Sequence, residues 1–221
     1  GMSRVVLSRE LSREEIRYIC ANSPIEIEVF GHGALCMCYS GQCYMSAVIG
    51  RRSGNRGQCA QPCRLPYGYD RFENKYPLSL KDNCLVHYLD ALKEMGVASL
   101  KLEGRMKRPE YVAVVTDVYR RALDGEKVTR EMTDALLTAF NRQGFTDGYY
   151  KSSLGRDMFG IRTKDDVIAA GDTYAYLHEL YRAERQSIGV KMDAKILADQ
   201  PMTLTVTDGD NTVTVSGDAP Q

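Results

Sequence analysis

Five of the seven cysteines in this chain of 221 residues lie in one glycine-rich segment, residues 30–64. Clustered thiolates bind zinc or iron–sulfur clusters, whereas one or two isolated cysteines are usually small packing residues. The last two cysteines of the segment have a spacing typical of a zinc pair, but the others are spaced as irregularly as iron–sulfur ligands often are. The spacing alone therefore predicts a metal site and leaves zinc and iron–sulfur open. The five are Cys36, Cys38, Cys43, Cys59 and Cys63.

The composition favours metal or redox chemistry over a disulfide scaffold. The number of cysteines is odd, and the first residues, Gly-Met-Ser-Arg, show no apolar signal segment. Because 29 basic residues balance 29 acidic ones, affinity for nucleic acid must come from a local patch. With 43% hydrophobic residues and no apolar run of about 20 residues, we expect a soluble, cytoplasmic protein without a membrane partner.

A basic patch of this kind lies within the cysteine-rich segment. Four arginines occur between residues 50 and 64 without an acidic residue, and two tyrosines follow them. Arginine binds phosphate groups and tyrosine stacks on bases, so the patch predicts RNA binding, with an ordinary solvated loop as the alternative. The arginines are Arg51, Arg52, Arg56 and Arg64.

Other candidates lie on or beside two predicted strands, residues 25–30 and 97–102. Charged side chains alternate with apolar ones there, so one charged face is either solvated or lines a site. The only histidine placed at a strand end follows the first strand, where barrel sites form, although a turn is an equal alternative. We expect the pocket to be lined by Glu28, His32, Lys101, Glu103 and Arg105.

The elements that must position these residues alternate between strand and helix over about 130 residues. Capping boxes predict helices after Ser12 and Ser79, and Pro109 and Thr129 suit the starts of two more. Strands separated by amphipathic helices favour parallel β–α–β units. Residues 188–197, 202–207 and 212–215 are predicted strands of a β-rich second part, with a hairpin turn at Asp208-Gly209.

The cysteine-rich segment resembles a known family. The run EVFGHGALCMCYSGQCYMSAVIGRRSGNRGQCAQPCRLPY, followed by SLKDNC and SLKLEGRMK, is similar to peptidase family U32, the collagenase-like proteins. The resemblance is strong over about residues 4–123 and weak beyond. GQCAQPCRLPY and LSLKDNC look closest to a branch whose members hydroxylate a cytidine of large-subunit ribosomal RNA. Sister branches hydroxylate a tRNA uridine or serve oxygen-independent ubiquinone synthesis.

The resemblance implies a 4Fe–4S cluster on a TIM-like barrel. It implies that the ligands are Cys36, Cys43, Cys59 and Cys63, with Cys84 as an alternate fourth ligand. Cys20 and Cys38 have no matching position and are expected to be packing residues. In protein purified in air, we expect the cluster to be lost or replaced by zinc.

Together these patterns predict an α/β chain. We expect a partial TIM-like barrel over residues 1–144 that carries the cysteine-rich loop 30–64. A connecting segment and an incomplete β-rich domain are expected over 145–221, and the chain as a whole is expected to be a fragment of a longer protein.

The predicted function is iron–sulfur-dependent hydroxylation of an RNA base, with RNA and a small-molecule oxygen donor as partners. A U32-type peptidase and a non-catalytic iron–sulfur module are the alternatives. The sequence lacks H-E-x-x-H and G-x-S-x-G motifs, so it gives the peptidase little support.

Overall fold

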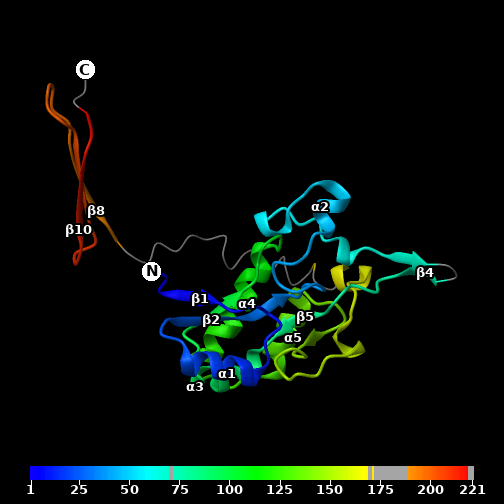
Figure 1. The fold of residues 1–221 in the computed structure, drawn as a ribbon. Helices are drawn as coiled ribbons and strands as arrows, with labels where there is room; N and C mark the ends of the chain where they lie inside the picture. The colour runs from blue at the N-terminus through cyan, green and yellow to red at the C-terminus, as the bar shows by residue number, and fades with distance from the viewer. Residues whose placement is uncertain (70–71, 169–170, 172–188, 219–221) are drawn as a thin grey trace. The chain divides into compact units, whose positions relative to one another are not determined.

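The computed structural model describes residues 1–221 except 70–71, 169–170, 172–188 and 219–221 (Figure 1). The chain divides into two compact units, Gly1–Leu180 and Tyr181–Gln221, and each is described by itself. No helix in the described ranges is long and apolar enough to cross a bilayer.

The first unit is built on a mixed sheet around the long strand β2 (Glu26–Ala34). β1 (Arg4–Val6) and β6 (Ser99–Leu102) pair with β2 in parallel, as the β–α–β pattern predicts. β5 (Asp82–Cys84) pairs with the end of β2 antiparallel, and β7 (Phe145–Thr146) pairs with β5 in parallel. The α/β class is therefore confirmed. The described strands form an open sheet, so the TIM-like barrel stays a prediction.

β2 changes its packing halfway along. Ile27 and Val29 are buried while Glu26 is exposed, which confirms the predicted alternation. From residue 31 the strand is buried on both faces, and glycines make this possible. Gly33 has a φ of +125°, and a Cβ on it would lie 2.6 Å from the Cβ of Glu103. The end of β2 therefore runs directly beneath the chain that follows β6.

Four helices cover this sheet. The side chains of Ser12 and Thr129 accept hydrogen bonds from the backbone N–H groups of Glu15 and Met132, both at 3.3 Å, so the caps predicted at these two residues are confirmed. Leu92 and Leu136 are among the most buried core side chains. The helices are α1 (Arg13–Asn22), α3 (Leu89–Glu94), α4 (Pro109–Leu123) and α5 (Arg130–Ala139).

The capping box predicted at Ser79 is wrong. Ser79 Oγ donates to the carbonyl of Gly160 at 2.7 Å, and Asp82 is the first residue of β5. The Asp82 side chain is completely buried and forms an ion pair with Arg142, 60 positions away. The helix begins later, with a 3-10 turn at Val86–Tyr88 that leads into α3. Ser79 and Asp82, which would have capped a helix, are thus paired with Gly160 and Arg142 instead.

Beyond β2, the rest of the cysteine-rich segment and the residues that follow it, up to Lys75, form short elements outside this sheet. Figure 1 shows α2 and the following hairpin projecting from the body of this unit. The elements are α2 (Met45–Gly50), 3-10 turns at Gly54–Arg56 and Pro62–Arg64, and the strands β3 (Tyr67–Tyr69) and β4 (Phe72–Lys75). After β7, a further 3-10 turn at Arg156–Met158 completes the described elements of this part.

The second unit contains an antiparallel three-stranded sheet in the order β10-β9-β8. Its strands are β8 (Lys191–Lys195), β9 (Thr203–Thr207) and β10 (Thr212–Ser216). The Asp208 carboxylate accepts hydrogen bonds from the N–H groups of Asp210 and Asn211, and Gly209 has a φ of +102°. The predicted strands and hairpin are confirmed, although residue 188 lies outside the described residues.

Candidate metal centre

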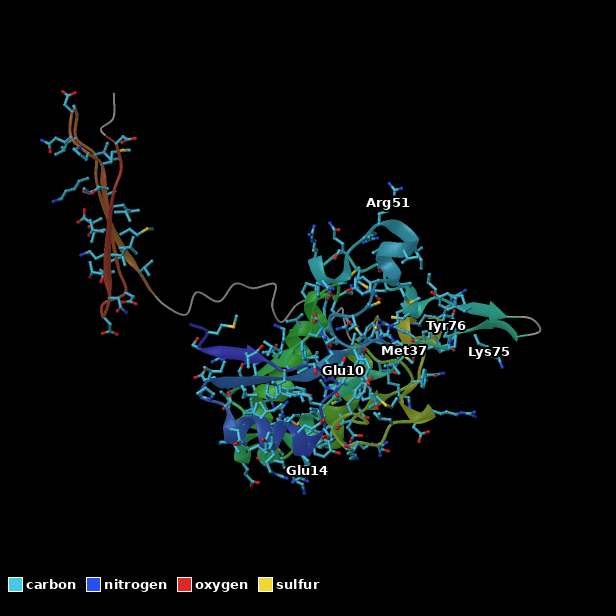
Figure 2. All side chains as sticks on the ribbon, in the orientation of Figure 1. Glu10, Glu14, Met37, Arg51, Lys75 and Tyr76 are labelled. Atoms are coloured by element: carbon cyan, nitrogen blue, oxygen red, sulfur yellow. The ribbon has the colours of Figure 1, made fainter. Side chains whose placement is uncertain are left out.

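The four predicted ligands line one cavity of about 590 Å³, which we call the cysteine cavity. Cys36 follows β2, Cys43 precedes α2, and Cys59 and Cys63 flank the start of the second 3-10 turn. All of them are free thiols. The labelled side chain of Met37, which also lines the cavity, marks its position in Figure 2. Residues spread over 28 positions of sequence are thereby brought to one place.

The sulfur of Cys59 is already hydrogen-bonded. It accepts from the backbone N–H of Gln61 at 3.3 Å and lies 3.8 Å from Ser46 Oγ. Gln61 has a left-handed φ of 56°, an uncommon conformation for a residue other than glycine. N–H···S bonds of this kind surround the ligands of iron–sulfur clusters and influence their potential. The local backbone is therefore suited to a metal-bound thiolate.

Burial keeps two of the thiols protonated. It raises the pKa of Cys36 and of Cys63, and neighbouring cysteines raise both further, while Arg9 opposes the change at Cys36 and Arg64 opposes it at Cys63. Metal binding must therefore displace protons here and is expected to become tighter as the pH rises.

The donor set fits a cluster or zinc in its chemistry. Five cysteines line the cavity, enough to supply the Cys₄ sets of 4Fe–4S clusters and structural zinc sites. Among the described residues, no three His, Cys, Asp or Glu side chains are close enough together to form a ready ligand group. Binding would thus require the thiols to move toward one another.

The other cysteines are placed differently. Cys84 is buried on β5, with its sulfur 3.8 Å from the Tyr119 hydroxyl, and it is not in the lining of the cysteine cavity. Cys20 packs against the core on α1, as predicted. Cys38, predicted to be a packing residue, lines the cavity with the four candidate ligands.

Two of the predicted pocket residues reach the cysteine cavity. Glu103 and Arg105 line it, and a Glu103 carboxylate oxygen accepts a hydrogen bond from the Arg105 N–H at 3.0 Å. Arg9 also lines it, 3.2 Å from Glu103, with its guanidinium over the Phe30 ring. The sequence analysis missed Arg9. Its signal is its place just beyond β1, because parallel strands end at a common edge.

The other predicted pocket residues lie elsewhere. Glu28 lies 3.8 Å from both Arg4 and Lys101, on the charged face of the sheet. His32 is 1% exposed, packed among the rings of Tyr111, Tyr119 and Phe145. Burial, followed by the charge of Lys107, lowers the pKa of His32 to about 3. None of Glu28, Lys101 and His32 is in the cavity lining.

The four arginines of the basic patch separate into two groups. Arg51, Arg52 and Arg56 are exposed at the end of α2 and on the turn that follows, and the labelled Arg51 points away from the body in Figure 2. Arg64 turns inward and donates to the carbonyls of Leu35 at 2.5 Å and Leu80 at 2.6 Å. The first three are exposed and can contact an external ligand, although Arg52 Nε also donates to the Gln58 carbonyl at 2.9 Å.

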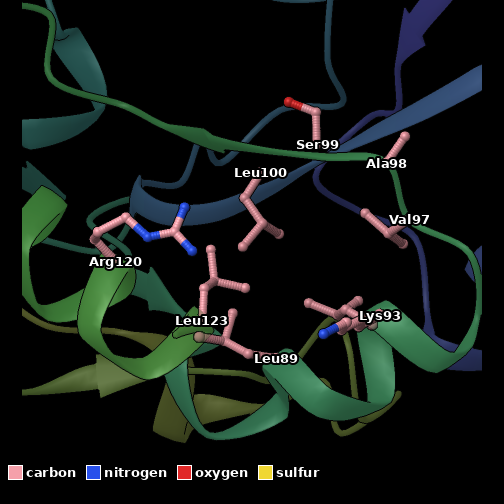
Figure 3. Close-up of a pocket in the computed structure, with 9 residues that line it drawn as sticks. Leu89, Lys93, Val97, Ala98, Ser99, Leu100, Arg120 and Leu123 are labelled. Carbon is pink, nitrogen blue, oxygen red and sulfur yellow. The ribbon is translucent and has the colours of Figure 1, made fainter. Parts of the chain in front are cut away.

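A separate cavity of about 330 Å³ lies between α3, α4 and β6 (Figure 3). Its lining is mostly aliphatic, including Leu89, Leu100 and Leu123, and its Arg120 is paired with Asp124 at 2.5 Å. No predicted site residue lines it, so we take the cysteine cavity as the candidate site.

Comparison with known protein families identifies the family of this chain. The model of peptidase family U32 matches residues 1–159, which include all the elements around the cysteine cavity. The chain belongs to peptidase family U32. The resemblance seen in the cysteine-rich segment is thereby confirmed.

U32 relatives carry two kinds of names. A collagenase of Porphyromonas gingivalis is 39% identical over 209 residues, covering 81% of this chain and 50% of the relative. The 23S rRNA 5-hydroxycytidine C2501 synthase of Escherichia coli is 47% identical over 130 residues, covering 56% of this chain and 20% of the relative. The tRNA hydroxylation protein P1 of Bacillus subtilis is 43% identical over 185 residues, covering 74% of this chain and 44% of the relative.

The chain thus spans half or less of the length of these relatives. No solved structure matches it.

Proposed function

We propose that this chain is part of an RNA-base hydroxylase in which Cys36, Cys43, Cys59 and Cys63 hold a 4Fe–4S cluster. The observation that carries the proposal is the single cavity shared by these four thiols. Two of the three relatives described above are named for hydroxylation of rRNA or tRNA, which supports RNA as the substrate. The modified base in this proposal is a cytidine or a uridine. Such substrates also support a cytoplasmic site of action.

A 4Fe–4S cluster, when bound, would supply one-electron redox chemistry. The chain's own residues would hold and surround it. The Gln61 N–H is already donated to Cys59, and Glu103 is held at the cavity wall by Arg9 and by the Arg105 backbone. Glu103 and Arg105 are therefore the residues best placed to orient a substrate base and a small-molecule oxygen donor.

The exposed arginines supply the RNA contact in this proposal. Arg51, Arg52 and Arg56 lie on the projecting part of the cysteine-rich segment, and Asn55 and Gly54 beside them also line the cysteine cavity. RNA phosphates bound by these arginines would place a neighbouring base at the cavity mouth. Single-stranded RNA is recognised in this way, with its backbone on basic side chains and its bases turned toward the protein.

A peptidase is the second candidate, supported by the relatives named collagenase. Peptide hydrolysis needs an activated nucleophile or a metal-bound water. His32 would have to serve there, but it is buried and its Nδ1 lies 3.4 Å from the Tyr119 hydroxyl. The geometry therefore favours the hydroxylase. A non-catalytic iron–sulfur module shares the cysteine site but predicts no change in RNA.

The test has two measurements. Iron and sulfide should be found in protein purified without oxygen. Deleting the gene for the full-length protein should remove one oxygen atom from a specific base, measured as a mass loss in digested rRNA or tRNA. RNA of unchanged mass would exclude the hydroxylase and leave the iron–sulfur module. Cleavage of peptides by metal-free protein would favour the peptidase.

A further inference from the structure

A tight turn at residues 39–42 carries an exposed tyrosine at the edge of the cysteine cavity. Tyr39 lines this cavity, yet it is 73% exposed. No other aromatic ring in the described part of the chain packs against it. The Tyr39 ring is therefore available to an external partner.

Hydrogen bonds hold this turn in place from both of its ends. Ser40 donates to the Glu10 carboxylate through its backbone N–H at 2.7 Å and through its hydroxyl at 3.0 Å. The Gln42 N–H donates to the Tyr39 carbonyl at 3.0 Å, and Gly41 has the positive φ, +78°, that a turn of this kind requires. Tyr39 thus projects from a backbone that is already ordered, so a ligand that binds to it need not order the turn.

The same turn is joined to the basic patch. The side-chain amide of Asn55 donates to the Gly41 carbonyl at 3.0 Å, and Asn55 belongs to the 3-10 turn that ends at Arg56. Arg56 is exposed, as are Arg51 and Arg52 at the end of α2. An open aromatic ring and exposed arginines on joined turns match the two parts of a single-stranded nucleotide, its base and its phosphate.

Tyr39 also borders a second hollow, of about 410 Å³. The other residues that line this hollow are all polar: Ser8, Glu10, Ser40 and Gln42. Hydroxyl and amide groups can donate to and accept from the edges of a base. Tyr39 therefore lies between the cysteine cavity and a hollow whose side chains suit a nucleotide base.

We propose that Tyr39 stacks on an unpaired base of RNA at the mouth of the cysteine cavity, an inference that rests on the RNA substrate of the proposed function. The exposed arginines would hold the phosphates and Tyr39 the base, which together orient the strand relative to the cysteines. A base within a duplex is already stacked on its neighbours, so Tyr39 favours RNA that is single-stranded at this point. The rival explanation is that another protein segment covers Tyr39.

The first test measures the affinity of this chain for labelled oligocytidylate and oligouridylate by fluorescence anisotropy. Tyr39→Ala should weaken binding about 5- to 150-fold, the usual effect of removing one stacking side chain. Tyr39→Leu should weaken it similarly and Tyr39→Phe should preserve it, because stacking needs an aromatic ring. The dependence on salt should stay the same in all three, since no charge is lost. Tyr18→Ala is the control, because Tyr18 is 71% exposed on α1 and lines neither hollow.

The second test uses the fact that the chain contains no tryptophan, so that Tyr39→Trp introduces a single indole at this site. Its emission should be that of a solvent-exposed indole in the free chain, and the oligonucleotides should quench it. The emission of Tyr18→Trp should not change. Blue-shifted emission of Tyr39→Trp before RNA is added would mean that protein covers this position, and would overturn the proposal.

The outcomes separate this inference from the proposed function, because neither measurement needs iron or RNA modification. Equal RNA binding by wild type and Tyr39→Ala would overturn the stacking contact and leave the hydroxylase in place. Absence of RNA binding by the wild-type chain would overturn the stacking contact and the arginine contact together. Binding that depends on Tyr39, combined with RNA of unchanged mass in the deletion strain, would overturn hydroxylation alone.

Discussion

The carboxylate of Glu103 lies 3.2 Å from the guanidinium of Arg9, although 94 positions separate the two residues in the sequence. Arg9 follows β1 and Glu103 follows β6, and both strands pair in parallel with β2. Their carboxyl ends therefore meet at one edge of the sheet. The Arg9–Glu103 ion pair lies at this edge of the sheet and lines the cavity of the cysteines that follow β2.

The ligand assignment predicts unequal effects of cysteine substitution. Changing Cys36, Cys43, Cys59 or Cys63 singly to Ser should lower iron content sharply in protein purified without oxygen, because a hydroxyl is a poor replacement for a soft thiolate. Cys84→Ser is the matched control, since Cys84 is buried away from the cavity. Normal iron in Cys63→Ser together with its loss in Cys84→Ser would move the fourth ligand to Cys84.

The exposed arginines should determine how salt affects RNA binding. Changing Arg51, Arg52 and Arg56 together to Gln should weaken binding of RNA by the full-length protein and flatten its dependence on salt. The expected change is roughly 0.7 in the log–log slope for each lost contact with single-stranded RNA. The same change at Arg120, Arg121 and Arg130, exposed on α4 and α5, should have little effect. Equal slopes for the two triple variants would make the basic patch an ordinary solvated loop.

Lys107 should make stability depend on pH. Burial lowers the pKa of Lys107 from 10.5 to about 7; Asp82 opposes this change, and the charges of Arg142, Arg162 and Arg64 contribute to it. Between pH 7 and 10.5 the unfolded chain binds more protons, so the contribution of Lys107 to stability rises with pH.

The corresponding measurement is the free energy of unfolding in denaturant, at several pH values from 7 to 9. The wild type should gain stability relative to Lys107→Met with a slope no steeper than about 1.4 kcal/mol per pH unit. Cysteine ionisation affects both proteins alike and cancels in the difference. Parallel curves would mean that Lys107 keeps an ordinary pKa.

Gly33→Ala tests the close approach between β2 and the loop after β6. Gly41→Ala is the control, because Gly41 also has a positive φ, of +78°, but has nothing within 4 Å of an added Cβ. Gly33→Ala should be the more destabilising by about 1–3 kcal/mol, the usual cost of overpacking, since its Cβ would meet Glu103 at 2.6 Å. Denaturant unfolding measures both, and equal losses would contradict the steric explanation.

Local sequence patterns predicted the helices and strands better than they predicted the residues that line the cysteine cavity. The caps at Ser12 and Thr129 and the alternation along β2 depend on neighbours within a few residues, so the sequence reveals them. Asp82 and Arg142 meet across 60 positions, and no local signal marks that contact.

The burial of His32 was also not visible in the local sequence pattern. Its position after an apolar run looks like the end of a strand, but β2 continues to Ala34 and buries it. The cysteines could be found because clustering in sequence is itself a signal. Arg9 could be found only once β1 and β6 were placed on either side of β2.

Arg64 has a consequence for how the metal centre is assembled. It directly follows Cys63, and its guanidinium donates to the carbonyl of Leu35, which directly precedes Cys36. This hydrogen bond joins the neighbours of Cys36 and Cys63, so it restrains the separation of these two thiols in the metal-free protein. Part of the conformational entropy lost on ordering the ligands is therefore already lost before metal binds. We expect iron to bind first to Cys36 and Cys63, the pair restrained by Arg64, and then to the segment that carries Cys43. Arg64→Met would remove this hydrogen bond and slow uptake of iron, although every cysteine ligand would remain in the chain.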